Sequence, residues 1–242
     1  MELPTKLSEI DLRFSKQKIG IIGAPGIGKS GFLAQNENAF FFDLEGGLNF
    51  LPCKKIAIRD WSDAEGVLKL LQKTKEAGKF PYDMIVLDTI DKLIDLAEER
   101  TIENAQNYYK KTDINVIGDI PEGKGWDTRR RMISSFIRDL VRLDCAVAFI
   151  GHLEIKRVEE EARKYDKSTI SIGGKVGGDL LSWPDHTLHI QTQLMGDKLV
   201  RTVYTKPTQS REAKSKGGIV PDGWRWTDND KDNWTKFRSL FK

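Results

Sequence analysis

Short, strongly apolar runs alternate along the chain with longer segments in which apolar residues recur at helical spacing. An apolar run bounded by glycine or by a charged residue is typical of a strand buried inside a sheet. Two later runs, HTLHIQT and LVRTVYT, predict a pair of strands joined near residues 195–197. The strands predicted from the earlier runs cover residues 18–23, 39–43, 55–58, 84–88 and 146–152.

The segments with helical spacing lie between these strands. Residues 62–77 place Val67, Leu68 and Leu71 at helical intervals, and Ser62 is a suitable N-cap. Strands that alternate with helices predict an α/β fold with a mainly parallel sheet, helices on both faces and antiparallel strands late in the chain. The other predicted helices run from the first glycine-rich turn to about residue 35, over 91–110 and over 126–143.

Composition and charge restrict the class of protein only moderately. The 242 residues suit one large α/β domain, and a net charge of +3 does not by itself indicate a nucleic-acid partner. Cys53 and Cys145 lie far apart without metal-ligand spacing, which fits a reducing compartment. The first residues have no apolar signal sequence, and no later segment resembles a membrane span. We therefore expect a cytoplasmic protein with no membrane association.

The sequence GAPGIGKS at residues 23–30 matches the phosphate-binding pattern G-x-x-x-x-G-K-[ST] and lies between a predicted strand and a predicted helix. Glycines let the backbone curl so that its N–H groups face phosphate oxygens, and the helix N-terminus adds partial positive charge. The alternative, a glycine-rich turn without a ligand, is disfavoured by the full motif in this context. The residues expected to bind the nucleotide are Gly23, Ala24, Pro25, Gly26, Ile27, Gly28, Lys29, Ser30 and Gly31.

Two acidic strand ends complete the predicted site for ATP and Mg²⁺. Asp88 ends a buried strand and, with the Ser30 hydroxyl, is expected to hold the metal. The acid that activates water often follows the metal acid directly, but Thr89 occupies that position here. Glu45 in FFFDLEGG leaves the second strand beside the phosphate loop, so we expect it to be the general base. A solvated turn acid is the alternative.

The motifs GAPGIGKS, FFFDLEGG, YDMIVLDTIDKL, GKGWDTRRRM and AFIGH resemble, in order and spacing, those of RecA-like (ASCE) P-loop NTPases. The resemblance is closest to phage-encoded RecA-fold proteins that include Rad-type single-strand-annealing ATPases, and it covers about residues 19–152. It implies that Lys29 and Glu45 are catalytic and that His152 is a sensor of the terminal phosphate. The alternative for His152 is a polar cap at a strand end. A phage origin would place the protein in the host cytoplasm.

The resemblance also implies two DNA-binding loops, at residues 112–125 and 153–178, which lack a clear strand or helix pattern. Basic residues there suit phosphates, and Tyr165 suits base stacking. Because acidic residues interleave with the cations, a solvated charged loop is an equally weighted alternative. The candidate DNA-binding residues are Lys124, Lys156, Arg157, Arg163, Lys164, Lys167 and Lys175.

RecA-fold assemblies complete each ATP site with a cation from the adjacent subunit, and the candidates are Lys206, Arg211 and Lys214. A basic strand that contacts nucleic acid is the alternative for this segment. We predict an N-terminal extension at residues 1–17, an ATPase core at 18–210 and a basic, tryptophan-rich tail at 211–242 that packs on the core. Docking of another protein on that tail is the minor alternative.

Together these features predict an ATPase that binds single-stranded DNA for recombination or annealing and hydrolyses ATP at the subunit interfaces of a homo-oligomer, either a filament or a ring. A single-strand-binding protein is a further candidate partner. The first alternative is a KaiC-like ATPase switch that acts on a protein partner without DNA. The second is a small-molecule kinase with the same phosphate loop, although no lid or acceptor motif is evident.

Overall fold

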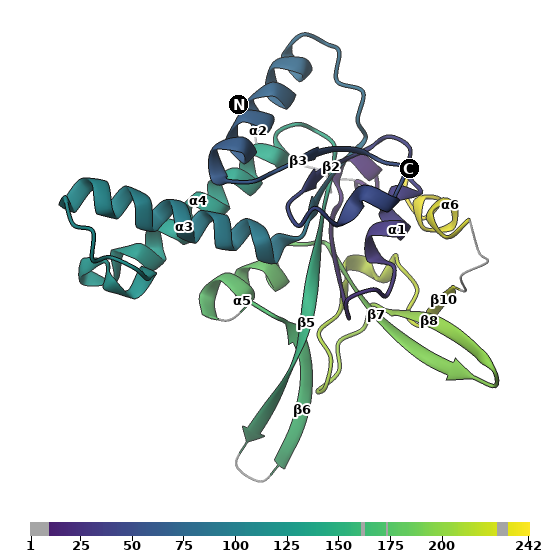
Figure 1. The fold of residues 1–242 in the computed structure, drawn as a ribbon. Coiled ribbons are helices and arrows are strands. Elements are labelled where there is room, and N and C mark those ends of the chain that lie inside the picture. Colours follow the sequence, from purple (N-terminus) through teal and green to yellow (C-terminus); the bar gives the residue numbers. More distant parts are fainter. Residues whose placement is uncertain (1–9, 161–162, 173, 227–231) are drawn as a thin grey trace, which may run out of the picture.

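The computed structural model describes residues 10–160, 163–172, 174–226 and 232–242, and at residues 160 and 163 it describes the backbone alone. Within these residues one sheet, with the strand order β10-β8-β7-β1-β5-β4-β2-β3, runs through the molecule (Figure 1). Strand β6 pairs with β5, and β9 pairs with β7. The strands are β1 (Lys18–Gly23), β2 (Ala39–Asp43), β3 (Lys54–Ala57), β4 (Met84–Asp88), β5 (Ala146–Glu160), β6 (Arg163–Ile170), β7 (His186–Met195), β8 (Lys198–Tyr204), β9 (Lys214–Ser215) and β10 (Trp224–Trp226).

The central strands are parallel and the late strands are antiparallel. Strand β5 lies between β1 and β4, so the strand that bears the phosphate loop and the strand that ends in Asp88 are not neighbours. Strands β8, β9 and β10 add antiparallel pairs at the β7 side. The predicted RecA-like α/β fold is confirmed. The helices are α1 (Lys29–Ala34), α2 (Trp61–Glu76), α3 (Ile90–Tyr109), α4 (Lys124–Val141), α5 (Gly174–Ser182) and α6 (Asn233–Arg238).

The three consecutive phenylalanines of β2 show how helices cover both faces of the sheet. Successive side chains of a strand point to opposite faces. Phe40 and Phe42 pack with α2, α3 and α4, whereas Phe41 packs in a second cluster with α1 and α6. Because all three rings are buried, the run is continuous rather than alternating, as expected for a central parallel strand.

Both ends of the described chain join the second of these clusters. Phe14 lies 5.6 Å from the ring of Trp234 and 5.9 Å from that of Phe241, measured between ring centroids. Trp226 on β10 stacks on Phe32 of α1 at 4.7 Å. The aromatic residues of the tail therefore hold α1, the helix that follows the phosphate loop, against the sheet.

The N-terminus of α2 differs from the prediction. The N-cap is Asp60, whose side chain accepts a hydrogen bond from the Asp63 backbone N–H at 2.8 Å, and not Ser62. Trp61 is the first helical residue and is buried, with its indole N–H donating to Glu65 at 3.1 Å. Burial of this ring brings the helix start two residues nearer the N-terminus than Ser62 would set it.

The prediction that residues 153–178 form a loop is wrong. Strand β5 continues to Glu160 and pairs with β6 in an antiparallel hairpin that projects from the body of the molecule, and α5 follows (Figure 1). Residues 112–125 contain two short 3₁₀ helices, Ile117–Asp119 and Pro121–Gly123, over a small cluster with Ala105. None of the helices in the described residues combines the length and apolar character needed to cross a membrane.

Candidate functional site

Parallel pairing brings the predicted site residues to one edge of the sheet. Gly23 at the end of β1 is in register with His152 on β5, and Asp43 at the end of β2 is in register with Asp88 at the end of β4. The carboxyl ends of parallel strands are the usual place for a ligand site in an open α/β sheet. The phosphate loop and both acidic strand ends therefore share this edge.

The phosphate loop curls around the Lys29 ammonium. Gly26 and Gly28 have φ values of 71° and 98°, in the left-handed region that favours glycine. The Lys29 Nζ is buried and donates to the backbone oxygens of Gly23 at 2.8 Å and Ala24 at 3.0 Å. Burial lowers the pKa of Lys29, and the acids opposite the loop oppose that effect. The loop thus has the curvature and the cation that a phosphate chain requires.

Asp88 has the features of a cation-binding carboxylate. It is buried, and burial is the largest of the causes that raise its pKa from 3.8 to about 6. A hydrogen bond from the Ser30 hydroxyl lowers the pKa, whereas the charges of Glu45 and Asp43 raise it. Asp43 Oδ1 is itself buried without a hydrogen-bond partner among the described residues. Oxygen ligands with excess negative charge suit Mg²⁺, so Ser30 and Asp88 fit the metal role predicted for them.

Glu45 and His152 meet beside this pair. The turn after β2 is anchored by the Leu44 N–H, which donates to the Asp88 carbonyl oxygen at 2.8 Å. Glu45 Oε1 accepts a hydrogen bond from the Thr89 hydroxyl at 2.7 Å. His152 Nδ1 lies 3.7 Å from the same oxygen. The side chain of Glu45 is partly open to solvent, so an oriented carboxylate with access to water lies next to the metal pair.

Comparison with known proteins identifies the family of the chain. A family model described as an AAA domain matches residues 15–216. The chain belongs to the AAA-domain family. It is accordingly a P-loop nucleotide-binding protein of an ATPase family, a class whose members usually use Mg²⁺. A search of curated proteins found no match.

Asp91 is a site residue of this AAA domain that the sequence reasoning treated only as the start of a helix. Its carboxylate accepts a hydrogen bond from the His152 backbone N–H at 3.1 Å and one from the Ser171 hydroxyl. Its Oδ2 also lies 3.6 Å from His152 Nδ1. The signal was a second acid three residues after Asp88, at the first turn of α3. Asp91 thus connects His152 to the segment that follows β6.

Arg201 is a second residue that sequence reasoning missed. It lies on β8, and its Nε donates to the carbonyl oxygen of Ile27 in the phosphate loop. A Cβ atom at Gly28 would lie 3.3 Å from that nitrogen, so glycine also makes room for the guanidinium. In the sequence, Arg201 is simply a cation within the predicted late strand LVRTVYT. The strand pairing that brings it to the phosphate loop is not readable from the sequence.

The three cations predicted to act on an adjacent subunit differ in their surroundings. The Arg211 guanidinium lies 3.6 Å from the ring centroid of Tyr204. The Lys214 ammonium donates to the Ser182 carbonyl oxygen at 2.7 Å. Lys206 is exposed at the end of β8, where the Asp222 carboxylate accepts its backbone N–H. Lys206 is therefore the member of the set best placed to reach another molecule.

Most cations predicted to contact DNA lie on the β5–β6 hairpin, and four of the seven candidates form ion pairs with acids in the described residues. Ion pairs of this kind are typical of a solvated charged surface. Arg157 and Lys175 have no ion pair within the part of the chain that the structure describes, and the Arg163 side chain lies outside that part. The pairs join Lys156 to Glu154 (2.5 Å), Lys164 to Glu159 (2.8 Å), Lys167 to Glu212 (2.5 Å) and Lys124 to Glu122 (2.7 Å).

Proposed function

We propose that this AAA domain hydrolyses ATP with Mg²⁺ and binds single-stranded DNA as a homo-oligomer in recombination or annealing. The observation that carries the proposal is the contact between Glu45 and His152 beside Asp88, together with the link from His152 through Asp91 to the segment that follows β6. An ATPase in which ATP hydrolysis controls the binding of a ligand at a distant site needs two features. These are a base for hydrolysis and a physical connection from the phosphate site to the ligand site.

The positions of the residues support the following roles. Lys29 and the loop glycines hold the triphosphate, and Ser30 with Asp88 holds the metal. When bound, Mg²⁺ neutralises negative charge on the phosphate oxygens. The Thr89 hydroxyl fixes one oxygen of Glu45, which leaves the other free to accept a proton from the attacking water. His152 is close enough to Glu45 for a change at either residue to move the other.

The ion pairs along the β5–β6 hairpin favour a second candidate function, an ATPase switch that acts on a protein partner without DNA. Paired cations contribute less to the attraction of a phosphate backbone than free cations do. Under this alternative, nucleotide state still controls the hairpin, but the hairpin contacts a protein. ATP-dependent capture of a protein without retention of DNA would favour this candidate.

The two candidates separate in a measurement of ATPase rate and DNA affinity. We expect single-stranded DNA to increase the rate, and a non-hydrolysable ATP analogue to increase the affinity for a fluorescent oligonucleotide, measured by anisotropy. A rate that is independent of DNA, combined with no nucleotide-dependent affinity, would reject the proposal in favour of the protein switch.

Two substitutions test the residue roles within the same assays. Lys29→Ala removes the loop cation and is expected to abolish nucleotide binding. Glu45→Gln preserves shape but removes the base, so ATP should remain bound while hydrolysis slows about a hundredfold or more. Glu37→Gln, at an exposed turn before β2, is the matched control and should behave like the wild type. Equal loss of nucleotide binding in the Lys29 and Glu45 variants would show that Glu45 is structural.

A further inference from the structure

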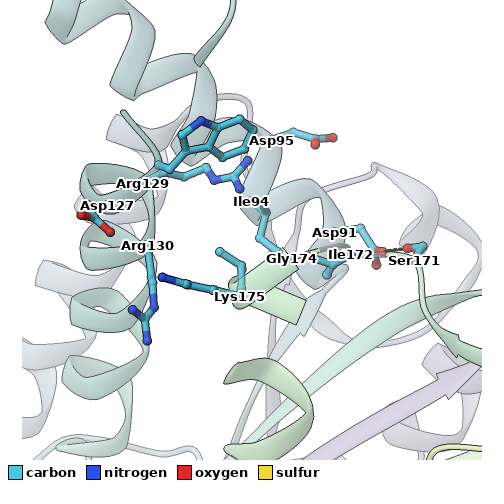
Figure 2. A pocket seen from close by; sticks show the side chains of 12 residues that line it. Asp91, Ile94, Asp95, Asp127, Arg129, Arg130, Ser171, Ile172, Gly174 and Lys175 are labelled. Atoms are coloured by element: carbon cyan, nitrogen blue, oxygen red, sulfur yellow. Dashed lines mark hydrogen bonds between the residues drawn. The ribbon is translucent and has the colours of Figure 1, made fainter. Parts of the chain in front are cut away.

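A cavity of about 740 Å³ lies among α3, α4 and the start of α5, with Asp91 and Ser171 at one end of its lining (Figure 2). Its apolar wall is formed by Ile94, Ile172 and Val176. Ser171, which precedes this wall, donates its hydroxyl to Asp91. The cavity therefore borders the ATP site but is not the phosphate site.

Trp126 gives the cavity an exposed aromatic surface. This residue lies in the first turn of α4, and half of its area, 50%, is exposed. The guanidinium of Arg129 lies 4.8 Å from its ring centroid and is itself held by Glu98. An indole fixed by a neighbouring cation and left open to solvent can stack on a flat ligand at little entropic cost.

Positive charge also faces the cavity. Lys175 extends from the first turn of α5 toward α4, whereas the carboxylates of Asp95 and Asp127 point away from the centre (Figure 2). Arg130 is held by two hydrogen bonds to Asp179, at 2.6 and 3.3 Å. Among the described residues that line the cavity, the ammonium of Lys175 is therefore the cation available to a ligand, and an anionic group is its natural partner.

A fixed indole, an apolar wall and an ammonium group complement one nucleotide: the base stacks, the sugar lies on the wall and the phosphate meets the cation. We propose that this cavity binds one unstacked nucleotide of a DNA single strand, with its base on Trp126 and its phosphate at Lys175. This inference rests on the proposed function and assigns the DNA contact to the cavity and not to the ion-paired hairpin.

The cavity is also connected to the catalytic base. Asp91 lines it, accepts the Ser171 hydroxyl on one side and accepts the His152 backbone N–H on the other. His152 in turn contacts Glu45. A nucleotide that moves Ser171 therefore shifts the sensor histidine against the base, which provides a route by which DNA accelerates hydrolysis.

The first experiment measures the affinity of the full chain for a short fluorescent oligothymidylate in the presence of a non-hydrolysable ATP analogue. Loss of one stacked base predicts about tenfold or greater weakening in Trp126→Ala, and Trp126→Phe should recover much of that loss. Tyr108→Ala, an exposed aromatic at the far end of α3, is the matched control and should bind like the wild type. Lys175→Gln should reduce the salt dependence of the affinity by about one phosphate contact, while the Trp126 variants leave it unchanged.

Each outcome decides between the inference and the function on which it depends. If the wild type binds no strand, both fail. If the wild type binds and Trp126→Ala binds equally well, with an unchanged melting profile, the cavity assignment alone is overturned. Competition by thymidine monophosphate at concentrations similar to those of the strand would also overturn it, because the cavity would then take a free small ligand.

The second experiment tests the connection through Asp91. In Asp91→Asn one carboxylate oxygen is replaced by an NH2 group, so the side chain no longer offers a separate oxygen to each of its two donors, the His152 N–H and the Ser171 hydroxyl. We therefore expect the strand to bind but no longer to accelerate ATP hydrolysis. The ratio of ATPase rates with and without saturating DNA is the readout, since a merely structural defect would lower both rates. An unchanged ratio would show that the signal does not pass through this carboxylate.

Discussion

The buried carboxylate of Asp88 should destabilise the protein in the absence of nucleotide and metal. Its pKa is raised from 3.8 to about 6, chiefly because burial penalises the charged form. A group whose folded-state pKa lies above its unfolded value contributes stability below the unfolded pKa, and that contribution is lost as pH rises through the folded pKa. Folding stability should therefore fall between about pH 4 and pH 6 on account of this residue.

Asp88→Asn isolates this effect, because the amide is neutral at every pH and retains an oxygen that can accept from the Ser30 hydroxyl. From the difference between the two pKa values, we expect Asp88→Asn to raise the free energy of unfolding by at most about 3 kcal/mol near pH 8 and by about 1 kcal/mol near pH 4.5. For a chain of this size the larger value corresponds to an increase in Tm of about 6 to 12 °C. The same substitution should abolish ATP hydrolysis, because the metal loses a charged ligand.

Urea and thermal unfolding of the protein without metal or nucleotide, at both pH values, measure the effect. Asp113→Asn, which removes an exposed loop carboxylate, is the control and should change stability little at either pH. A stabilisation by Asp88→Asn that is the same at both pH values would refute the electrostatic explanation. A variant less stable than the wild type near pH 8 would show that Asp88 supports the fold in a way that its burial does not reveal.

Two further residues of the site have separable kinetic effects. Arg201→Ala should raise the KM for ATP several-fold with a smaller change in kcat, because the guanidinium braces the phosphate loop; Arg201→Lys should recover only part of the affinity, and an unchanged KM would exclude this role. His152→Ala should lower kcat while the affinity for a non-hydrolysable analogue stays near that of the wild type, since the His152 side chain contacts the proposed base Glu45; equal loss of affinity would instead place it in nucleotide binding.

The parts of the fold that could be predicted from sequence are those in which burial imposes a pattern. The apolar run Phe40 to Phe42 predicts a central strand, and its rings pack in clusters on both faces of the sheet. The phosphate-loop motif predicts a strand before it and a helix after it. The β5–β6 hairpin escaped prediction because its strands pair charged residues, such as Lys156 with Lys167, in a ladder open to solvent. No apolar period marks such strands, and a cross-strand ion pair between Lys164 and Glu159 adds to their backbone hydrogen bonds. Arg201 was missed for another reason, namely that its contact joins segments distant in sequence.

The charge balance at the sheet edge explains why these residues act as one site. Asp88, Asp91 and Glu45 all act electrostatically on the buried cation Lys29, so acids outnumber this cation before any ligand arrives. A triphosphate alone would add more negative charge to this edge, whereas a triphosphate with a divalent metal brings the cation that Asp88 lacks. We therefore expect electrostatics to couple nucleotide binding to metal binding. Any change in that charge reaches His152 through its contacts with Glu45 and Asp91, which are the same contacts that lead to the cavity beside Trp126.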